Sequence, residues 1–122
     1  MGEGRARPWG NEFDKSRCNS SEGRRGGTTP VDAYSNGASP YEVLDIVGNV
    51  SEWTHTLFKE YPYDAEDGRE SEKAFGNRVM RGGSFSSSRG SVRCASRGYP
   101  EPDYRHYDFG FRVAASPVSP EK

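Results

Sequence analysis

Alternation of apolar and polar positions is clearest near the C-terminus, in "FGFRVAA" at residues 109–115. Phe109, Phe111 and Val113 fall on one side of an extended chain, and Arg112 falls on the other. A period of two over a run of this length is typical of a half-buried strand. The pattern therefore predicts a strand over residues 109–115.

A pair of strands is predicted further upstream, on either side of a glycine turn. "RVMR" at residues 78–81 and "VRCASR" at residues 92–97 are short runs that contain apolar residues. Gly82-Gly83 and a serine-rich loop separate them, and such residues mark turns. We expect a strand, a tight turn, a loop and a second strand.

In most of the remaining chain, apolar residues do not recur with the period of 2 residues typical of a strand or 3.6 residues typical of a helix. Residues 1–40 are rich in Gly, Pro, Ser, Asn and Thr, which predicts consecutive turns, with one short strand opening at Pro30-Val31. Residues 59–77 are polar and acidic and predict an exposed loop. Residues 98–108 predict a second loop, rich in Tyr, Pro and Asp.

The most apolar run, residues 41–58, has a mixed pattern. Val43, Val47 and Val50 have helical spacing, but Gly48-Asn49 lies between them and disfavours a helix. Turn residues inside an apolar run, flanked by acids, instead indicate a backbone loop around a cation, with Val47 and Trp53 anchoring it to the core.

Composition points to a folded domain that is rich in loops. The chain has 122 residues, which is enough for one domain, and Leu, Ile, Val and Phe make up only 17 of them. Such a low fraction accompanies disorder when the net charge is also high, but here the net charge is -1. Seven Tyr, six Phe and two Trp supply large side chains for burial. We therefore expect an aromatic core supported by hydrogen bonds and bound ions.

Charge and hydropathy also exclude some function classes. Acids are interleaved with the arginines, which disfavours general nucleic-acid binding. No apolar run is long enough to span a membrane. The first ten residues, "MGEGRARPWG", lack the apolar core of a signal peptide, so we expect a cytoplasmic protein or a chain without its natural N-terminus.

The two cysteines, Cys18 and Cys94, show no spacing that indicates a zinc site. In a reducing cytoplasm, two buried free thiols are favoured. A disulfide between them is the alternative.

Six motifs in order resemble the C-terminal part of the formylglycine-generating enzyme (sulfatase-modifying factor) family. They are "PWGNEFD", "GGTTPV", "GNVSEWT", "RVMRGGSF", "RCASR" and "FGFRVAA". The resemblance runs from about Pro8 to Ala115. It implies an irregular α+β fold related to C-type lectins, with short antiparallel strands. Residues 1–116 would be the C-terminal portion of the domain and residues 117–122 a tail. Because the N-terminal half that precedes "PWG" in the family does not occur in this sequence, we expect either a fragment or a chain that pairs with that half in another chain.

The resemblance places a calcium site in "DIVGNVSE", residues 45–52. Asp45 and Glu52 would give carboxylate oxygens, and Gly48 and Val50 would give main-chain carbonyls, which are the ligands that calcium prefers. The alternative from the residues alone is that the two acids cap a turn or pair with arginine.

A weaker calcium region matches the family at "CNSSEG". Asn19, the Ser20 carbonyl and Glu22 would be its ligands, and the alternative is an ordinary polar loop. Arg112 matches a family arginine that we expect to be structural and paired with a buried acid.

The family's oxidases carry a copper-binding cysteine three residues after the serine that corresponds to Ser84, and a second one shortly beyond. Here that third position is Ser87, and residues 85–93 contain no cysteine. A hydroxyl is a poor ligand for copper(I). Ser51 also stands where the family has an aromatic residue near its substrate groove. We therefore expect no copper and no catalytic residue, with Ser84 and Ser87 at the family's active-site loop.

The tyrosine-rich loop after residue 98 and the serine run match the variable, ligand-binding region of diversified relatives with this fold. Tyrosine combines rigid contact area with a polar tip. The alternative is that some of these tyrosines are core residues and the rest have no role. The predicted ligand-binding residues are Ser51, Ser86, Tyr99, Asp103, Tyr104 and His106.

Three functions follow from the resemblance. The favoured one is a non-catalytic, calcium-stabilised domain that binds a peptide or protein. The second is a formylglycine-generating oxidase that converts a sulfatase cysteine, which would require Cys18 and Cys94 to meet and act as the pair. The third is an accessory domain of a larger enzyme, such as a sulfoxide synthase.

Overall fold

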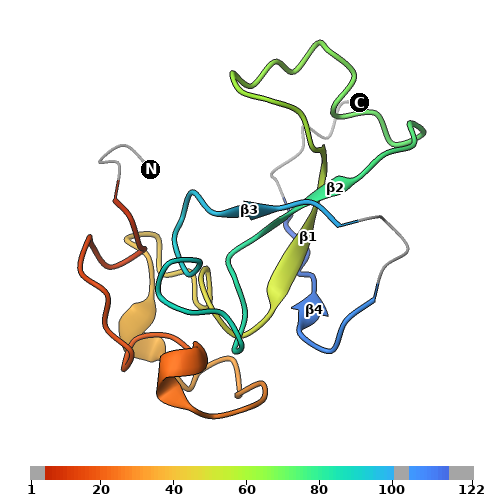
Figure 1. Ribbon diagram of the computed structural model, residues 1–122. Helices are drawn as coiled ribbons and strands as arrows, with labels where there is room; N and C mark the ends of the chain where they lie inside the picture. The colour runs from red at the N-terminus through yellow and green to blue at the C-terminus, as the bar shows by residue number, and fades with distance from the viewer. Residues whose placement is uncertain (1–4, 101–104, 116–122) are drawn as a thin grey trace.

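A four-stranded mixed sheet lies at the centre of the protein (Figure 1). The structure is a computed structural model, and it describes residues 5–100 and 105–115. The order in the sheet is β3-β2-β1-β4, where β1 is Ser51–Leu57, β2 is Arg78–Arg81, β3 is Arg97–Gly98 and β4 is Phe109–Gly110. The neighbours β1–β2 and β2–β3 are antiparallel, whereas β4 runs parallel to β1.

The chain before the sheet is irregular, as its turn residues predict. It contains two short 3-10 helices, η1 at Ser21–Gly23 and η2 at Ser35–Gly37. No α-helix occurs in the part of the chain that the structure describes, so the α+β expectation is replaced there by a mostly β fold. Pro30-Val31 enters a turn, so the strand predicted there is wrong. The predicted tail, residues 117–122, lies outside the described residues.

The two strands predicted on either side of the glycine turn have different outcomes. The strand at "RVMR" is confirmed as β2, and Gly82 and Gly83 turn the chain after it with φ of 96° and 69°. The strand predicted at residues 92–97 is wrong except at Arg97. Val92 is buried in the core, and the chain after it forms a series of turns.

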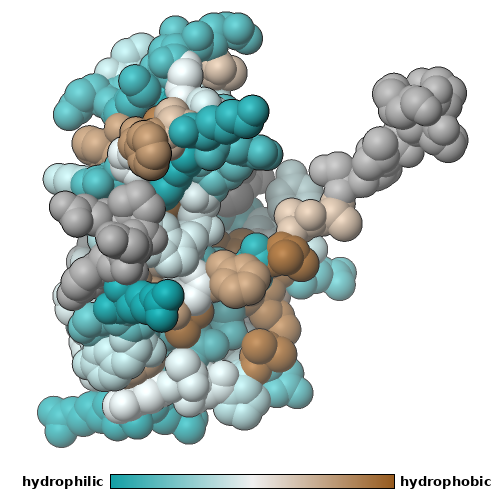
Figure 2. Space-filling model, turned by 90° about the vertical axis from the view of Figure 1, so that its right-hand side faces the viewer, coloured by the Kyte–Doolittle hydropathy of each residue, from teal (hydrophilic) through white to brown (hydrophobic). Residues whose placement is uncertain are grey.

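The C-terminal strand is shorter than its alternation predicts. Only Phe109–Gly110 joins the sheet, and Phe111 and Val113 are 73% and 86% exposed. The side chain of Arg112 is bonded to Glu52 and to main-chain carbonyls of the turn before β1, which places its two neighbours on the outer side. Figure 2, which faces the side of the molecule at the right of Figure 1, shows apolar side chains in separate places on this face, with polar side chains between them.

The longest strand, β1, is not predicted by the apolar pattern. Its residues, "SEWTHTL", combine aromatic and β-branched side chains that suit a pleated surface, but polar residues hide the alternation. Trp53 pairs with Met80, Leu57 pairs with Arg78, and an irregularity in the ladder separates the two pairs. Trp53 also packs edge-on against Phe109 with ring centroids 5.8 Å apart, which ties β1 to β4.

The core is small and mainly aliphatic. Cys18, Val47 and Val92 form its buried cluster, with Trp9, Phe13 and Ile46 packed against them. Val47 therefore anchors the turn that precedes β1, as predicted, whereas Trp53 is half-buried and packs on Phe109 outside this cluster. The expected aromatic core is wrong for most of the tyrosines, because only one of those described is buried. The large exposed tyrosines are Tyr41, Tyr61, Tyr63, Tyr99 and Tyr107.

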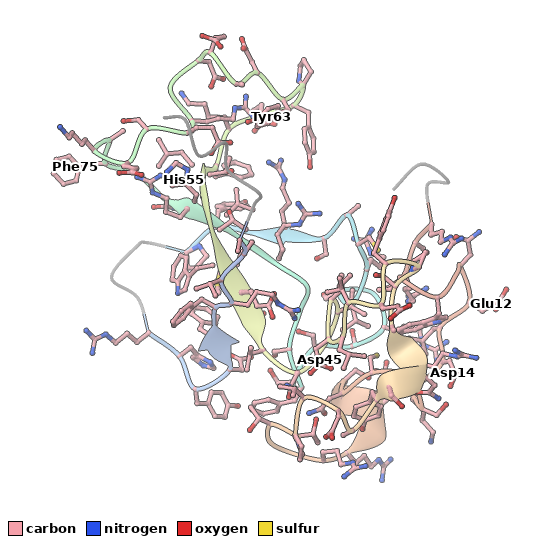
Figure 3. All side chains as sticks on the ribbon, turned by 180° about the vertical axis from the view of Figure 1, so that it is seen from behind. Glu12, Asp14, Asp45, His55, Tyr63 and Phe75 are labelled. Atoms are coloured by element: carbon pink, nitrogen blue, oxygen red, sulfur yellow. The ribbon has the colours of Figure 1, made fainter. Side chains whose placement is uncertain are left out.

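The loop between β1 and β2 projects from one end of the sheet, where Figure 3 labels Tyr63 and Phe75. Its predicted exposure is confirmed for most of its residues. Arg69 is the exception at 3% exposed, and it pairs with Asp67 at 2.8 Å and donates to the carbonyls of Glu60 and Pro62. The loop therefore has an internal scaffold built around one buried guanidinium.

No helix among the described residues is long and apolar enough to cross a membrane.

Candidate functional site

The turn before β1 is built from residues with left-handed backbone conformation. Asp45, Gly48 and Asn49 have φ of 55°, 84° and 71°. The Gly48 N–H donates to the carbonyl of Gly82 at 2.8 Å, and the Asn49 N–H donates to the carbonyl of Asn19 at 2.9 Å. The turn is thereby joined both to the glycine turn after β2 and to the N-terminal segment.

Arg112 closes this turn from the C-terminal side. Its guanidinium donates to both carboxylate oxygens of Glu52 at 2.8–3.1 Å and to the carbonyls of Leu44 and Asp45 at 2.8 and 2.7 Å. The predicted pairing of Arg112 with an acid is confirmed, although Glu52 is half-buried and not buried as expected. Charge-assisted bonds of this bidentate kind are among the strongest in proteins.

The two predicted carboxylate ligands therefore have protein partners as well. Asp45, labelled in Figure 3, accepts a bond from the Asn49 side chain at 3.2 Å. Burial raises the pKa of Asp45, and Arg112 and Asn49 oppose that shift. No group of three or more His, Cys, Asp or Glu side chains that could hold a metal occurs within the described ranges. A cation at this turn would thus rest on two carboxylates together with main-chain carbonyls such as those of Gly48 and Val50.

The weaker calcium region contains one buried acceptor without a partner. Asn19 is 0% exposed, and its Oδ1 accepts no hydrogen bond from any described residue. Its Nδ2 donates to the carbonyl of Gly27 at 2.9 Å. Both carboxylate oxygens of Glu22 are occupied, by the Ser20 hydroxyl at 2.9 Å and the Arg89 N–H at 2.8 Å. An orphaned amide oxygen carries an energetic cost that a bound cation would remove.

A cluster of hydroxyls around one carboxylate forms the centre of the serine loop. The Ser84 and Ser86 hydroxyls donate to Oδ2 of Asp108 at 2.6 and 2.7 Å, and His106 Nδ1 lies 2.6 Å from Oδ1. Ser87 completes the loop, with its Oγ accepting the Ser84 N–H at 2.9 Å. We call these five residues the serine–carboxylate cluster.

Asp108 also connects the cluster to the sheet, because its carbonyl accepts the N–H of Ser51 at 2.9 Å. Burial alone would raise the pKa of Asp108, but bonds from Ser84, Ser86 and His106 together lower it below its ordinary value. Beside the cluster is a pocket of about 260 Å³ that Ser51, Ser87 and Phe109 help to line. Among the described residues, no cysteine lines this pocket.

The predicted ligand-binding residues are only partly brought together. Ser51, Ser86 and His106 meet at Asp108, and Tyr107 is exposed beside them, packed edge-on against Phe85 with ring centroids 5.5 Å apart. Tyr99 instead stacks on Phe58 at 4.0 Å. Asp103 and Tyr104 lie outside the described residues.

Both cysteines are free thiols, but only Cys18 is buried as the favoured alternative expects. Cys18 is buried in the core, and burial raises its pKa to about 11. Cys94 is half-buried, and burial raises its pKa as well. Cys94 lines a different pocket, on the Glu52 face of the sheet.

Sequence reasoning missed Asp108, the centre of the cluster. The available signal is its place directly before the apolar "FGF" run, in a loop where the predicted ligand-binding acid is Asp103. Its partners Ser84 and Ser86 are more than 20 positions away in the chain, so no local pattern connects them.

Replacing Asp108 with asparagine should destabilise the protein by about 2–3 kcal/mol, because an amide NH₂ would face groups that donate to the carboxylate. Asp108 is 7% exposed, so water cannot replace the lost bonds. Thermal and urea unfolding measure the effect. Asp32→Asn, at an exposed position, is the matched control and should change stability by less than about 0.5 kcal/mol.

The cost of Asp108→Asn should also depend on pH. The folded-state pKa of Asp108 is lowered, so its carboxylate contributes fully above the unfolded value of about 3.9 and loses that contribution as the pH falls through the folded value. The stability difference between the two proteins should therefore shrink below about pH 4. A difference that is constant from neutral to acidic pH would contradict the assigned role.

The chain has detectable similarity to known proteins over nearly its whole length. Residues 2–117 match the family described as "Sulfatase-modifying factor enzyme 1-like domain". The serine/threonine-protein kinase pkn1 of Chlamydia caviae is 37% identical over 114 residues, which cover 88% of this chain and 17% of that protein. The formylglycine-generating enzyme of Mus musculus is 35% identical over 118 residues, which cover 93% of this chain and 31% of that protein. The chain thus spans less than a third of the length of either relative.

One solved structure has a similar arrangement of the chain. Treponema denticola variable protein 1 has a TM-score of 0.67 at 22% identity, over 88% of this chain and 40% of that one. At this level of identity the likeness concerns the fold.

Proposed function

Because the chain belongs to the sulfatase-modifying factor enzyme 1-like domain family, we propose that it is a non-catalytic member that binds a peptide or protein ligand and is stabilised by calcium. The observation that carries this proposal is the serine–carboxylate cluster. Hydroxyls of Ser84, Ser86 and Ser87 occupy the loop where the resemblance places the thiolates of an oxidase, and the carboxylate of Asp108, directly before β4, accepts bonds from two of them.

The donor set of this loop does not fit copper(I). Copper(I) prefers soft thiolate and thioether ligands, and the cluster offers hard oxygens and one imidazole. Neither thiol can substitute, because Cys18 packs in the core and Cys94 lines a pocket on the other face of the sheet. Burial raises the pKa of both cysteines, which keeps them protonated at neutral pH. We therefore derive no oxidation step for this chain.

The same loop suits recognition. Its pocket combines hydroxyls of Ser51 and Ser87 with the aromatic ring of Phe109. Tyr107 is exposed beside the cluster and adds a large side chain with a polar tip. Pockets that bind ligands combine apolar walls with a few fixed polar groups. Here the Ser84 N–H donates to the Ser87 hydroxyl, and the Ser51 N–H donates to the carbonyl of Asp108, which holds both residues in place. The proposed ligand is a peptide or protein segment with apolar and hydrogen-bonding groups.

Calcium at the Asp45–Glu52 turn is proposed from the resemblance and the left-handed backbone that wraps the turn. Excess calcium should raise the midpoint of thermal unfolding by several degrees, since a ligand that binds only the folded state stabilises it by mass action. The double variant Asp45→Ala/Glu52→Ala should lose this shift. Magnesium is the control cation. The variant Asn19→Ala tests whether the region around Asn19 also contributes to the calcium-induced shift in the unfolding midpoint. An unchanged calcium shift in the double variant would place the cation elsewhere.

A second candidate is an accessory domain of a larger protein. The match to the chlamydial relative favours this candidate, because it covers only 17% of that protein and most of the protein lies outside it. This candidate is compatible with a non-catalytic role. An assay for conversion of the cysteine of a peptide to formylglycine distinguishes both candidates from an oxidase. The proposal predicts that this chain does not catalyse the conversion.

A further inference from the structure

A pocket with three arginines lies on the Glu52 face of the sheet, away from the serine–carboxylate cluster. Its guanidinium groups come from Arg81 in β2, Arg93 in the loop after the core residue Val92, and Arg112 after β4. Glu52 pairs with Arg81 in the β1–β2 ladder, so both point to this face. The neighbouring residue, Ser51, lines the pocket of the cluster instead.

The pocket carries uncompensated positive charge. Arg112 is neutralised by Glu52, which is the single acid in the lining. Arg81 donates to the main-chain carbonyls of Cys94 and Ser96, and Arg93 donates to that of Gly90. Carbonyls fix the guanidinium groups but do not neutralise them. Within residues 5–100 and 105–115, neither Arg81 nor Arg93 forms an ion pair, so two positive charges remain.

Both of these arginines also retain hydrogen-bond donors. A guanidinium has five N–H groups. Arg81 uses Nε and Nη2 for the two carbonyls, and Arg93 uses Nε alone. The remaining groups of two guanidiniums can bind an anion in a bidentate manner, as arginine does with carboxylates.

The rest of the lining is apolar and the space is small. Val43, which is 39% exposed, and Ile46 form one wall, and the half-buried Cys94 forms another part. The pocket measures about 270 Å³. Pockets for drug-sized molecules range from roughly 300 to 1,000 Å³, so this one fits a smaller group.

We propose that this pocket binds a carboxylate attached to a short aliphatic group. The carboxylate would pair with Arg81 and Arg93, and the aliphatic part would pack on Val43 and Ile46. Two sources share this chemistry, a free aliphatic acid and the C-terminal carboxylate of a peptide that ends in an aliphatic residue. Arg81 and Gly82 also line the pocket beside the serine–carboxylate cluster, whereas Arg93, Cys94, Val43 and Ile46 line only this one of the two. The inference therefore does not depend on the ligand proposed for the cluster.

Titration calorimetry tests the proposal with three probes: pentanoate, a short peptide ending in valine, and the same peptide with an amidated C-terminus. We expect pentanoate or the free-acid peptide to bind, and the amidated peptide to bind at least tenfold more weakly than its free acid. Binding by pentanoate alone would identify the free acid as the ligand, and binding by the peptide alone would identify the C-terminus. Binding by inorganic phosphate but by neither carboxylate would overturn the ligand class.

Arg93→Gln is the informative variant, because Arg93 makes a single main-chain bond within its own loop. It should weaken carboxylate binding at least tenfold. Arg105→Gln removes the same charge at an exposed position outside the pocket and should bind like the wild type. Equal affinity of Arg93→Gln and Arg105→Gln would overturn the proposal.

The reactivity of the Cys94 thiol gives a second measurement, which is independent of calorimetry. Its thiol lines the pocket, whereas Cys18 is buried, so disulfide reagents report on Cys94. The readout is the rate of reaction with the dianionic reagent dithiobis(nitrobenzoate) divided by the rate with neutral dithiodipyridine. This ratio should be several-fold higher in the wild type than in Arg93→Gln, because Arg93 attracts the anionic reagent. Pentanoate or the free-acid peptide should slow both reactions. Equal reagent ratios in the two proteins, without protection by either carboxylate, would contradict an anion-binding pocket.

Discussion

Replacing Gly48 with alanine is expected to leave the protein unfolded under conditions in which the wild type is folded. Gly48 has φ of 84°, where an alanine costs about 1 kcal/mol. The steric cost is greater, because an added Cβ would stand 2.6 Å from the carbonyl oxygen of Asn19. That carbonyl accepts the N–H of Asn49, so it cannot retreat without breaking the bond that joins the turn to the N-terminal segment. We expect a total cost above about 4 kcal/mol, comparable to the whole stability of a small domain.

Gly26→Ala is the matched control for Gly48→Ala. Gly26 has φ of 72°, and nothing lies within 4 Å of the position where its Cβ would be. This variant carries the backbone strain without the collision and should lose only about 1 kcal/mol. Circular dichroism with thermal and urea unfolding measures both proteins. If Gly48→Ala unfolds within a few degrees of Gly26→Ala, the close contact with Asn19 does not have the importance assigned to it.

The parts of the fold that could be predicted are those with a local cause. "RVMR" followed by two glycines indicates a strand and a turn, and Gly48-Asn49 indicates a turn inside an apolar run. The strand β1 could not be predicted in this way, because Ser51, Thr54 and Thr56 interrupt its apolar pattern. Its stability comes from pairing with β2 and β4, which are far apart in the chain.

The C-terminal segment illustrates how a long-range bond overrides a local pattern. Residues 109–115 alternate as a strand should, yet only Phe109–Gly110 pairs with β1. Arg112 reaches Glu52 and the carbonyls of Leu44 and Asp45, on the same face as the Gly110–Glu52 pair. Phe111 and Val113 then point away from the body of the chain, where the described residues offer them little to pack against.

The candidate site, like the fold, could be predicted from the sequence only in part. The pairing of Arg112 with an acid is predictable from a family resemblance, whereas the serine–carboxylate cluster is not. The sequence indicates the serine loop and His106 as recognition residues, but it does not indicate Asp108, the acid that unites them. The contacts of Asp108 join segments more than 20 residues apart and fix hydroxyls that a loop of serines would otherwise leave mobile.

We propose that this chain does not carry out the oxidase reaction of the formylglycine-generating enzymes that it resembles, because oxygen ligands occupy the loop that would need thiolates. The most direct measurement incubates the protein with a Cys-x-Pro-x-Arg peptide, copper and oxygen, and follows by mass spectrometry the loss of mass that accompanies conversion of the thiol to an aldehyde. The formylglycine-generating enzyme of Mus musculus is the positive control. The variant Cys18→Ser/Cys94→Ser is the matched control, because it removes the only thiols of the chain. We predict that the wild type converts no more peptide than this variant does. Conversion at an enzymatic rate by the wild type, lost in the double variant, would contradict the account.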